Sequence, residues 1–114
     1  MLELWFDQDL NEPVSVRTVS GNIFHQDAGG NKIGVRVTKD GASYALSSGT
    51  VTGYVIRADG TTITISGTRS GNTAYIILPA TACSVKGPIQ IVIKLTQGSE
   101  IVTLAAMQSS VLAA

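Results

Sequence analysis

Apolar residues recur at every second position along most of this chain, and many of them are β-branched. The clearest run spans residues 88–95, where Ile89, Ile91, Ile93 and Leu95 alternate with other side chains. Successive side chains of a strand point to opposite faces, so this run predicts a strand with one buried face. The same alternation predicts strands over residues 14–19, 33–38, 51–56, 61–66, 73–78 and 101–107, with a short one near Trp5. Helical spacing is hard to find.

Turn sequences separate these runs, at residues 27–32, 39–41, 58–60, 70–72 and 97–99. Asp59-Gly60 lies between two strand patterns, so residues 54–57 and 61–66 should pair as a hairpin. Residues 78–84 break the pattern: Pro79 ends a strand, and the small residues up to Ser84 predict one helical turn in a crossover between sheets. Seven or eight strands at roughly ten-residue spacing indicate a β-sandwich or a barrel.

The length of 114 residues suits one domain with one core. We divide it into residues 1–12, an N-terminal arm or edge strand, and residues 13–114, a single β-sandwich domain. Charged residues make up only 14% of the chain, against roughly 25% in typical domains, while there are eleven Ser and twelve Thr. A surface with many hydroxyl groups and few charges is better suited to contact with neighbouring subunits than to a free monomer in solution. The balanced, scattered charges argue against nucleic-acid binding.

The single Cys83 excludes an internal disulfide and fits synthesis in a reducing compartment. The N-terminus carries acidic residues where an export signal would carry basic ones. No stretch reaches the 18 or more apolar residues of a membrane helix, so no membrane association is expected.

Candidate catalytic and metal-binding residues are few. His25 is the only histidine, which leaves neither a histidine metal cluster nor a catalytic triad, and Cys83 has no nearby base. Asp27–Asn31 resembles the start of a calcium loop but offers one carboxylate, so a flexible loop is the better interpretation. We therefore expect no enzymatic activity, no cofactor and no metal.

The N-terminal segment carries the candidate partner interface, formed by Leu4, Trp5, Phe6, Asp9 and Leu10. Trp5 and Phe6 are adjacent and face opposite sides of a strand, so one ring packs inward and the other is offered to a partner. An aromatic sugar-binding platform stays an alternative, but these two rings cannot both join it. Asp7, Asp9 and Glu12 fit a solvated acidic arm better than glycosidase chemistry.

Several phrases of the sequence, in order, resemble a family of small virion domains of phages of Gram-positive hosts: the head fibre or capsid decoration proteins, similar to the N-terminal domain of baseplate upper proteins. The phrases are Gln8-Asp9-Leu10, Pro13-Val14-Ser15-Val16, Gly49-Thr50-Val51, Ile56-Arg57-Ala58-Asp59-Gly60, Leu78-Pro79-Ala80, Gly87-Pro88-Ile89-Gln90-Ile91 and Lys94-Leu95. They span nearly the whole chain and carry no catalytic motif.

The resemblance implies an immunoglobulin-like antiparallel β-sandwich of seven to eight strands with the helical turn near Pro79–Ser84. It also implies a structural protein that is made in the bacterial host cytoplasm and lies on the virion surface, as a capsid decoration or head-fibre anchoring domain. Its partners would be the major capsid protein or other virion subunits, and it would form a homo-oligomer such as a trimer. A baseplate or tail adaptor is the first alternative and a carbohydrate-binding module the second. Longer family members continue past the last strand, whereas this sequence ends at Val111–Ala114, which favours decoration or anchoring over host recognition.

Overall fold

The structure is a computed structural model that describes residues 3–18, 24–25, 30–46 and 48–112. Its strands are β1 Glu3–Asp9, β2 Val16–Thr18, β3 Phe24–His25, β4 Asn31–Lys39, β5 Ala42–Ser43, β6 Thr50–Ile56, β7 Thr62–Ser66, β8 Thr68–Ser70, β9 Thr73–Leu78, β10 Gly87–Gln97 and β11 Glu100–Leu112. One 3₁₀ turn, η1 Ala80–Cys83, joins β9 to β10. The fold is therefore almost entirely β, as the alternation predicts.

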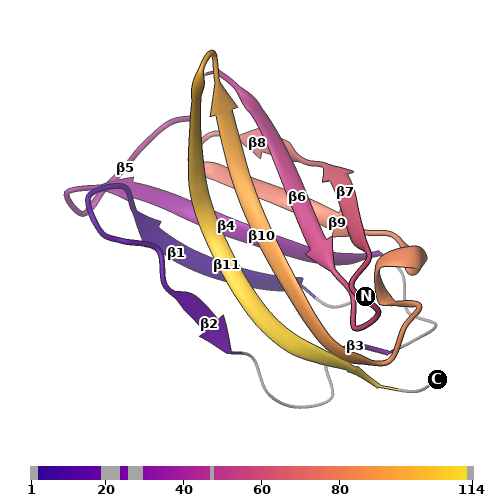
Figure 1. Cartoon of the computed structure of the whole chain (residues 1–114). Helices are drawn as coiled ribbons and strands as arrows, with labels where there is room; N and C mark the ends of the chain where they lie inside the picture. The colour runs from indigo at the N-terminus through magenta and orange to yellow at the C-terminus, as the bar shows by residue number, and fades with distance from the viewer. Residues whose placement is uncertain (1–2, 19–23, 26–29, 47, 113–114) are drawn as a thin grey trace.

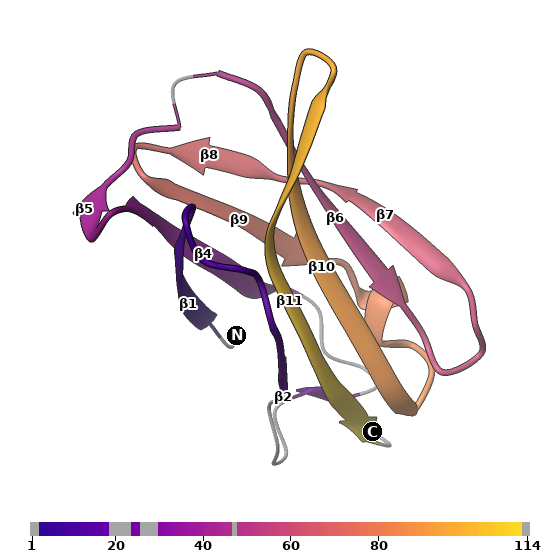
Figure 2. The same ribbon diagram turned by 60° about the vertical axis from the view of Figure 1, so that its left-hand side comes forward.

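Two sheets pack face to face as a β-sandwich, which confirms the predicted fold class (Figure 1). Sheet A has the order β1-β4-β9-β8, with β5 also paired to β4. Sheet B has the order β2-β11-β10-β6-β7, with β3 also paired to β11. The longest strands, β10 and β11, form a twisted hairpin along sheet B (Figure 2).

The prediction of antiparallel sheets needs a correction, because both sheets are mixed. β1 runs parallel to β4, and β2 and β3 run parallel to β11. Alternation is the same in parallel and antiparallel strands, so the sequence pattern could not distinguish them. A parallel pair needs a long crossover connection. Here the chain leaves β1, passes through β2 and β3 in sheet B, and returns to sheet A as β4. These short strands also raise the number in the described residues from the predicted seven or eight to eleven.

The core lies between the sheets and is built from the alternating positions. In β10, Ile89, Ile91 and Ile93 are each 1% exposed and Leu95 is 3% exposed, which confirms the predicted buried face. They meet the inward side chains of sheet A: Ile33, Val35, Val37, Ala74, Ile76 and Leu78. Each fully buried Val, Ile or Leu side chain stabilises the fold by about 1.5–3 kcal/mol.

Two Asp-Gly turns close hairpins, one at the predicted turn 39–41 and one at the predicted hairpin around Asp59-Gly60. Asp40 and Gly41 connect β4 to β5, and both have positive φ, 54° and 84°, which a type I′ turn requires. The β6–β7 hairpin confirms the predicted pairing around Asp59-Gly60. Residues 31–32, by contrast, belong to β4 and not to the predicted turn at 27–32, and residues 26–29 lie outside the described residues.

The segment after β9 crosses from sheet A to sheet B through η1, as predicted. The guanidinium of Arg57, after β6, donates to Thr81 O at 3.2 Å and Ser84 Oγ at 3.1 Å. It also pairs with Asp59 Oδ2 at 2.7 Å. Arg57 thus fastens the β6–β7 turn to the crossover.

Gly67 is the point at which one edge of the sandwich changes sheet. β7 pairs with β6 in sheet B, and after Gly67 the chain continues as β8, which pairs with β9 in sheet A. A Cβ atom at Gly67 would lie 2.5 Å from Val51 Cγ1 and 2.8 Å from the backbone oxygen of Tyr75. Only glycine fits this close approach of the two sheets.

Candidate functional site

The outer face of sheet A carries a cluster of aromatic and cationic side chains. Trp5 in β1 lies opposite Gly34 in β4, and Gly34 lies opposite Tyr75 in β9. Because Gly34 has no side chain, the two rings meet above it, edge to face, with centroids 6.3 Å apart and planes at 66°. A Cβ atom at Gly34 would lie 2.4 Å from the Trp5 ring. The indole of Trp5 therefore packs directly on the backbone of Gly34, in the space that any other side chain at this position would fill.

Cations cover the faces of these two rings. The guanidinium carbon of Arg36 lies 5.1 Å from the centroid of the Trp5 ring, and Lys32 Nζ lies 4.5 Å from that of Tyr75. Such contacts stabilise by about 0.5–1 kcal/mol at exposed sites. Trp5 Nε1 donates to Glu3 Oε1 at 3.1 Å. We call Trp5, Lys32, Arg36 and Tyr75 the aromatic–cation cluster. Its rings and guanidinium are the side chains most enriched at protein interfaces.

The cluster is not a flat platform for a sugar. Two rings inclined at 66° present no common plane, and Arg36 and Lys32 lie over the ring faces that a sugar would stack on. The geometry thus favours contact with protein over contact with carbohydrate.

The predicted interface residues separate between the two sides of β1. Leu4, Phe6 and Leu10 are half-buried and pack against the core, while Trp5 lies on the outer face. Strand alternation explains this division. Trp5 is the predicted residue that the structure brings together with Lys32, Arg36 and Tyr75.

Asp9, at the end of β1, is held by hydrogen bonds within its own chain and is not a freely solvated carboxylate. Its carboxylate accepts hydrogen bonds from the backbone N–H of Asn11 (2.9 Å) and Gly41 (2.9 Å), and from Thr38 Oγ1 (3.0 Å) and the Asp40 N–H (3.3 Å). These bonds, those from Asn11 and Gly41 first, hold the pKa of Asp9 below its ordinary value. The carboxylate ties β1 to the β4–β5 turn.

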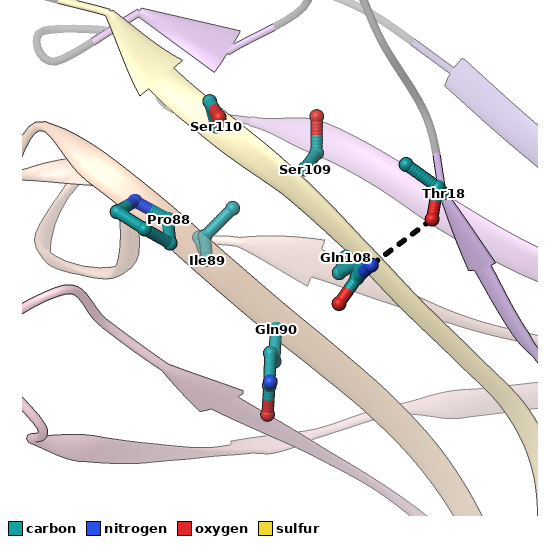
Figure 3. Close-up of a pocket in the computed structure, with 7 residues that line it drawn as sticks. All are labelled: Thr18, Pro88, Ile89, Gln90, Gln108, Ser109 and Ser110. Atoms are coloured by element: carbon teal, nitrogen blue, oxygen red, sulfur yellow. Dashed lines mark hydrogen bonds between the residues drawn. The ribbon is translucent and has the colours of Figure 1, made fainter.

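The outer face of sheet B has a different chemistry and is hollowed. One hollow of about 360 Å³ is lined by Thr18, Pro88, Ile89, Gln90, Gln108, Ser109 and Ser110 (Figure 3). Across it, Gln108 Nε2 donates to Thr18 Oγ1 at 3.0 Å. Its lining offers amides and hydroxyls but no acid or base with which to start catalysis.

A second hollow on this face is larger and more apolar. It measures about 480 Å³ and is lined by Tyr54, Ile56, Thr62, Val92, Lys94, Thr103 and Ala106. Lys94 is the one charged residue of this lining, and its Nζ lies 5.5 Å from the centroid of the Tyr54 ring. The face is suited to apolar contact with a neighbour rather than to chemistry on a small substrate.

The remaining chemical candidates can be placed in part. Cys83 is fully buried in the core, and burial raises the pKa of its thiol, so at neutral pH it is protonated and shielded. The side chain of His25 and most of the loop from Asp27 lie outside the described residues. Within the described ranges, no three His, Cys, Asp or Glu side chains gather into a metal site. No helix among them is long and apolar enough to span a membrane.

Comparison with known proteins gives a likeness of fold. No protein-family model matches the chain, and no curated protein matches it. Among solved structures, the N-terminal domain of ORF48 of phage TP901-1 is similar, with a TM-score of 0.55. The likeness covers 99% of this chain and 98% of that one, at 11% identity. The chain shares the fold of a phage protein domain.

Sequence reasoning found Trp5 but missed the residues that surround it. Tyr75 and Gly34 lie far from Trp5 in sequence, and their meeting depends on the register of three strands. A glycine inside an apolar strand is the one signal that pointed to a close approach at residue 34.

Proposed function

We propose that this chain is a non-catalytic structural domain of a phage particle and serves as an adaptor in the baseplate or tail. The observation that carries the proposal is the fold likeness, which extends over almost the full length of both chains. The matched structure is the N-terminal domain of a phage protein. The order of turn and strand phrases in the sequence resembles the same class of virion proteins. Two separate observations thus support a virion role.

The proposal changes the location that the sequence favoured. Sequence resemblance led first to capsid decoration, with the baseplate as the alternative, and no comparison supports the head. The fold neighbour fits the baseplate alternative better. We therefore make the baseplate the leading location.

We propose the aromatic–cation cluster as the surface that contacts another virion subunit. The Trp5 ring packs over Gly34 and meets the Tyr75 ring edge to face, so little conformational freedom is lost on binding. Leu4, Phe6 and Leu10 already pack against the core of their own chain, and Asp9 is engaged in the β4–β5 turn. Of the five interface residues predicted from the sequence, the proposed surface thus keeps Trp5, and it adds Lys32, Arg36 and Tyr75.

The location is tested on purified phage particles separated into heads and tails. The chain should be found in the tail fraction by mass spectrometry, and immunogold labels should lie at the tail tip. Labelling confined to heads would overturn the baseplate location, and absence from the particle would overturn the virion role.

The contact surface is tested by complementing a phage that lacks the gene. Trp5→Ala should lower incorporation into particles, because truncating a central aromatic anchor commonly costs about 2 kcal/mol, or about thirtyfold in affinity. Ile101→Ala is the matched control, since Ile101 is 65% exposed in the distant β10–β11 hairpin. Both variants are first checked for native circular dichroism. Equal incorporation of the two would contradict the proposed surface.

A further inference from the structure

The edge of sheet B at β7 lacks the features that usually protect an edge strand. Residues Thr62–Ser66 read Thr-Ile-Thr-Ile-Ser, with no charge, no proline and no bulge. Proteins normally block an exposed edge with one of these, because its unpaired backbone groups attract another strand. In the described part of the chain, β7 pairs with β6 alone. Figure 2 shows β7 at one margin of the sandwich, running into β8.

The hydrogen bonds at both ends of β7 identify which backbone groups face outward. Arg57 N donates to Thr61 O at 2.9 Å, and Gly67 N donates to Val51 O at 2.8 Å. In an antiparallel pair, alternate residues direct both backbone groups to the partner strand. Residues 61, 63, 65 and 67 therefore face β6. The N–H and C=O groups of Thr62, Thr64 and Ser66 face away from it, along the free edge.

Other edges of the two sheets are better protected. β1 carries Glu3, Asp7 and Asp9 at the edge of sheet A. The first half of β11 begins at Glu100 and contains an irregularity in its pairing opposite Ile93 and Lys94. These charges and this bulge oppose the approach of a further strand.

The one charged residue on the β7–β8 edge, Arg69, does not protect β7 against pairing with another strand. Arg69 in β8 donates from Nε to Gly49 O and from an Nη to Leu46 O, each at 2.9 Å. Its guanidinium is therefore held on the loop before β6, within its own chain. The uncharged stretch is left open to a partner.

We propose that a second copy of this chain pairs with β7, antiparallel, about a two-fold axis at Thr64. The pattern is self-complementary: Thr64 faces Thr64 of the second copy, and Thr62 faces its Ser66. Each facing pair exchanges two hydrogen bonds, because all three residues direct their backbone groups outward. Ile63, half-buried at the edge, comes opposite Ile65 of the second copy and extends the apolar layer.

This pairing commits to a second copy because the edge suits itself. No charge lies among the five residues, so the two-fold axis places no like charges opposite one another. An isologous contact also needs one surface that matches itself, which the alternating Thr and Ile side chains provide. The proposal concerns self-association and is independent of where the domain lies in the particle.

Sedimentation of the 114-residue chain from about 1 µM to about 1 mM tests the pairing. The wild type should shift from monomer to dimer as concentration rises. Thr64→Pro removes the central N–H donor, which faces outward, so the intrachain ladder with β6 is kept and the dimer is lost. A wild type that is monomeric throughout this range, or that forms a trimer, would overturn the pairing.

Charge variants at Thr64 test the register. Thr64→Lys and Thr64→Glu each place like charges opposite one another and should weaken self-association up to about fivefold, whereas their mixture should restore it as a heterodimer. Gln90→Lys is the matched control, because it adds the same charge to an exposed position in β10 of the same sheet. Equal weakening by Gln90→Lys, or no recovery in the mixture, would contradict pairing at Thr64. These charge variants test the pairing even if the Thr64→Pro variant does not fold.

Discussion

Gly67→Ala should destabilise the domain more than its small size suggests, because Gly67 is where the chain passes from sheet B to sheet A. The added methyl group would lie 2.5 Å from Val51 Cγ1 and 2.8 Å from the Tyr75 backbone oxygen. Tyr75 is held within β9 between β4 and β8, so its carbonyl cannot rotate aside. The two sheets must separate locally.

The expected magnitude follows from two opposing effects. Overpacking in a rigid site costs about 1–3 kcal/mol, and the backbone obstacle places this site near the upper end. Replacing glycine by alanine restricts the unfolded chain and returns about 0.4–1 kcal/mol. The net loss should be about 2 kcal/mol. For a domain of this length, that lowers Tm by about 8–10 °C.

The assay is thermal and urea unfolding followed by circular dichroism, with Gly98→Ala as the control. Gly98 has a φ of 59° and nothing within 4 Å of an added Cβ, so this control measures the cost of an alanine at positive φ where no atom obstructs the added methyl group. That cost is about 1 kcal/mol. If Gly67→Ala is no more destabilising than Gly98→Ala, the reasoning about the sheet switch is wrong.

Three further predictions test separate parts of the structure. Gly34→Ala should displace the indole of Trp5, the only tryptophan, and shift its fluorescence to longer wavelength; an unchanged spectrum would mean that the ring is not seated there. Asp9→Asn should lower Tm at pH 7, and the difference from the wild type should shrink as the pH falls below about 3.9. A folded-state pKa below that unfolded value stabilises the fold above it, and the effect is lost as the pH falls through the folded-state pKa. A pH-independent difference would refute this. Cys83 should react with a thiol reagent only after denaturation, and rapid labelling of the native protein would contradict its burial.

The sequence predicted the elements whose signal is local. The alternation from Ile89 to Leu95 identified β10 and its buried face, and Asp59-Gly60 identified the β6–β7 hairpin. Both depend on neighbours within a few residues. Strand period and turn chemistry were therefore sufficient for most strands and for the sandwich class.

Features that depend on distant residues could not be predicted in the same way. The parallel direction of β1 follows from the path of the chain through the opposite sheet, which alternation does not encode. Gln8 occupies an inward position of β1 and is 7% exposed, because its amide donates to Asp9 O at 2.9 Å and Glu12 O at 3.0 Å. A polar residue at a core position is understood only when its partners are known.

The two proposed contacts use different sheets and should act independently. The aromatic–cation cluster lies on the outer face of sheet A, on β1, β4 and β9, whereas the self-pairing edge is β7 of sheet B. Trp5→Ala should therefore lower incorporation into particles without changing the monomer–dimer equilibrium. Thr64→Pro should instead abolish the dimer of the isolated chain and leave the aromatic–cation cluster unchanged. Variants at separate sites without shared partners are expected to add. If Trp5→Ala also abolished the dimer, the two contacts would be one surface, and the assignment of self-association to β7 would fail.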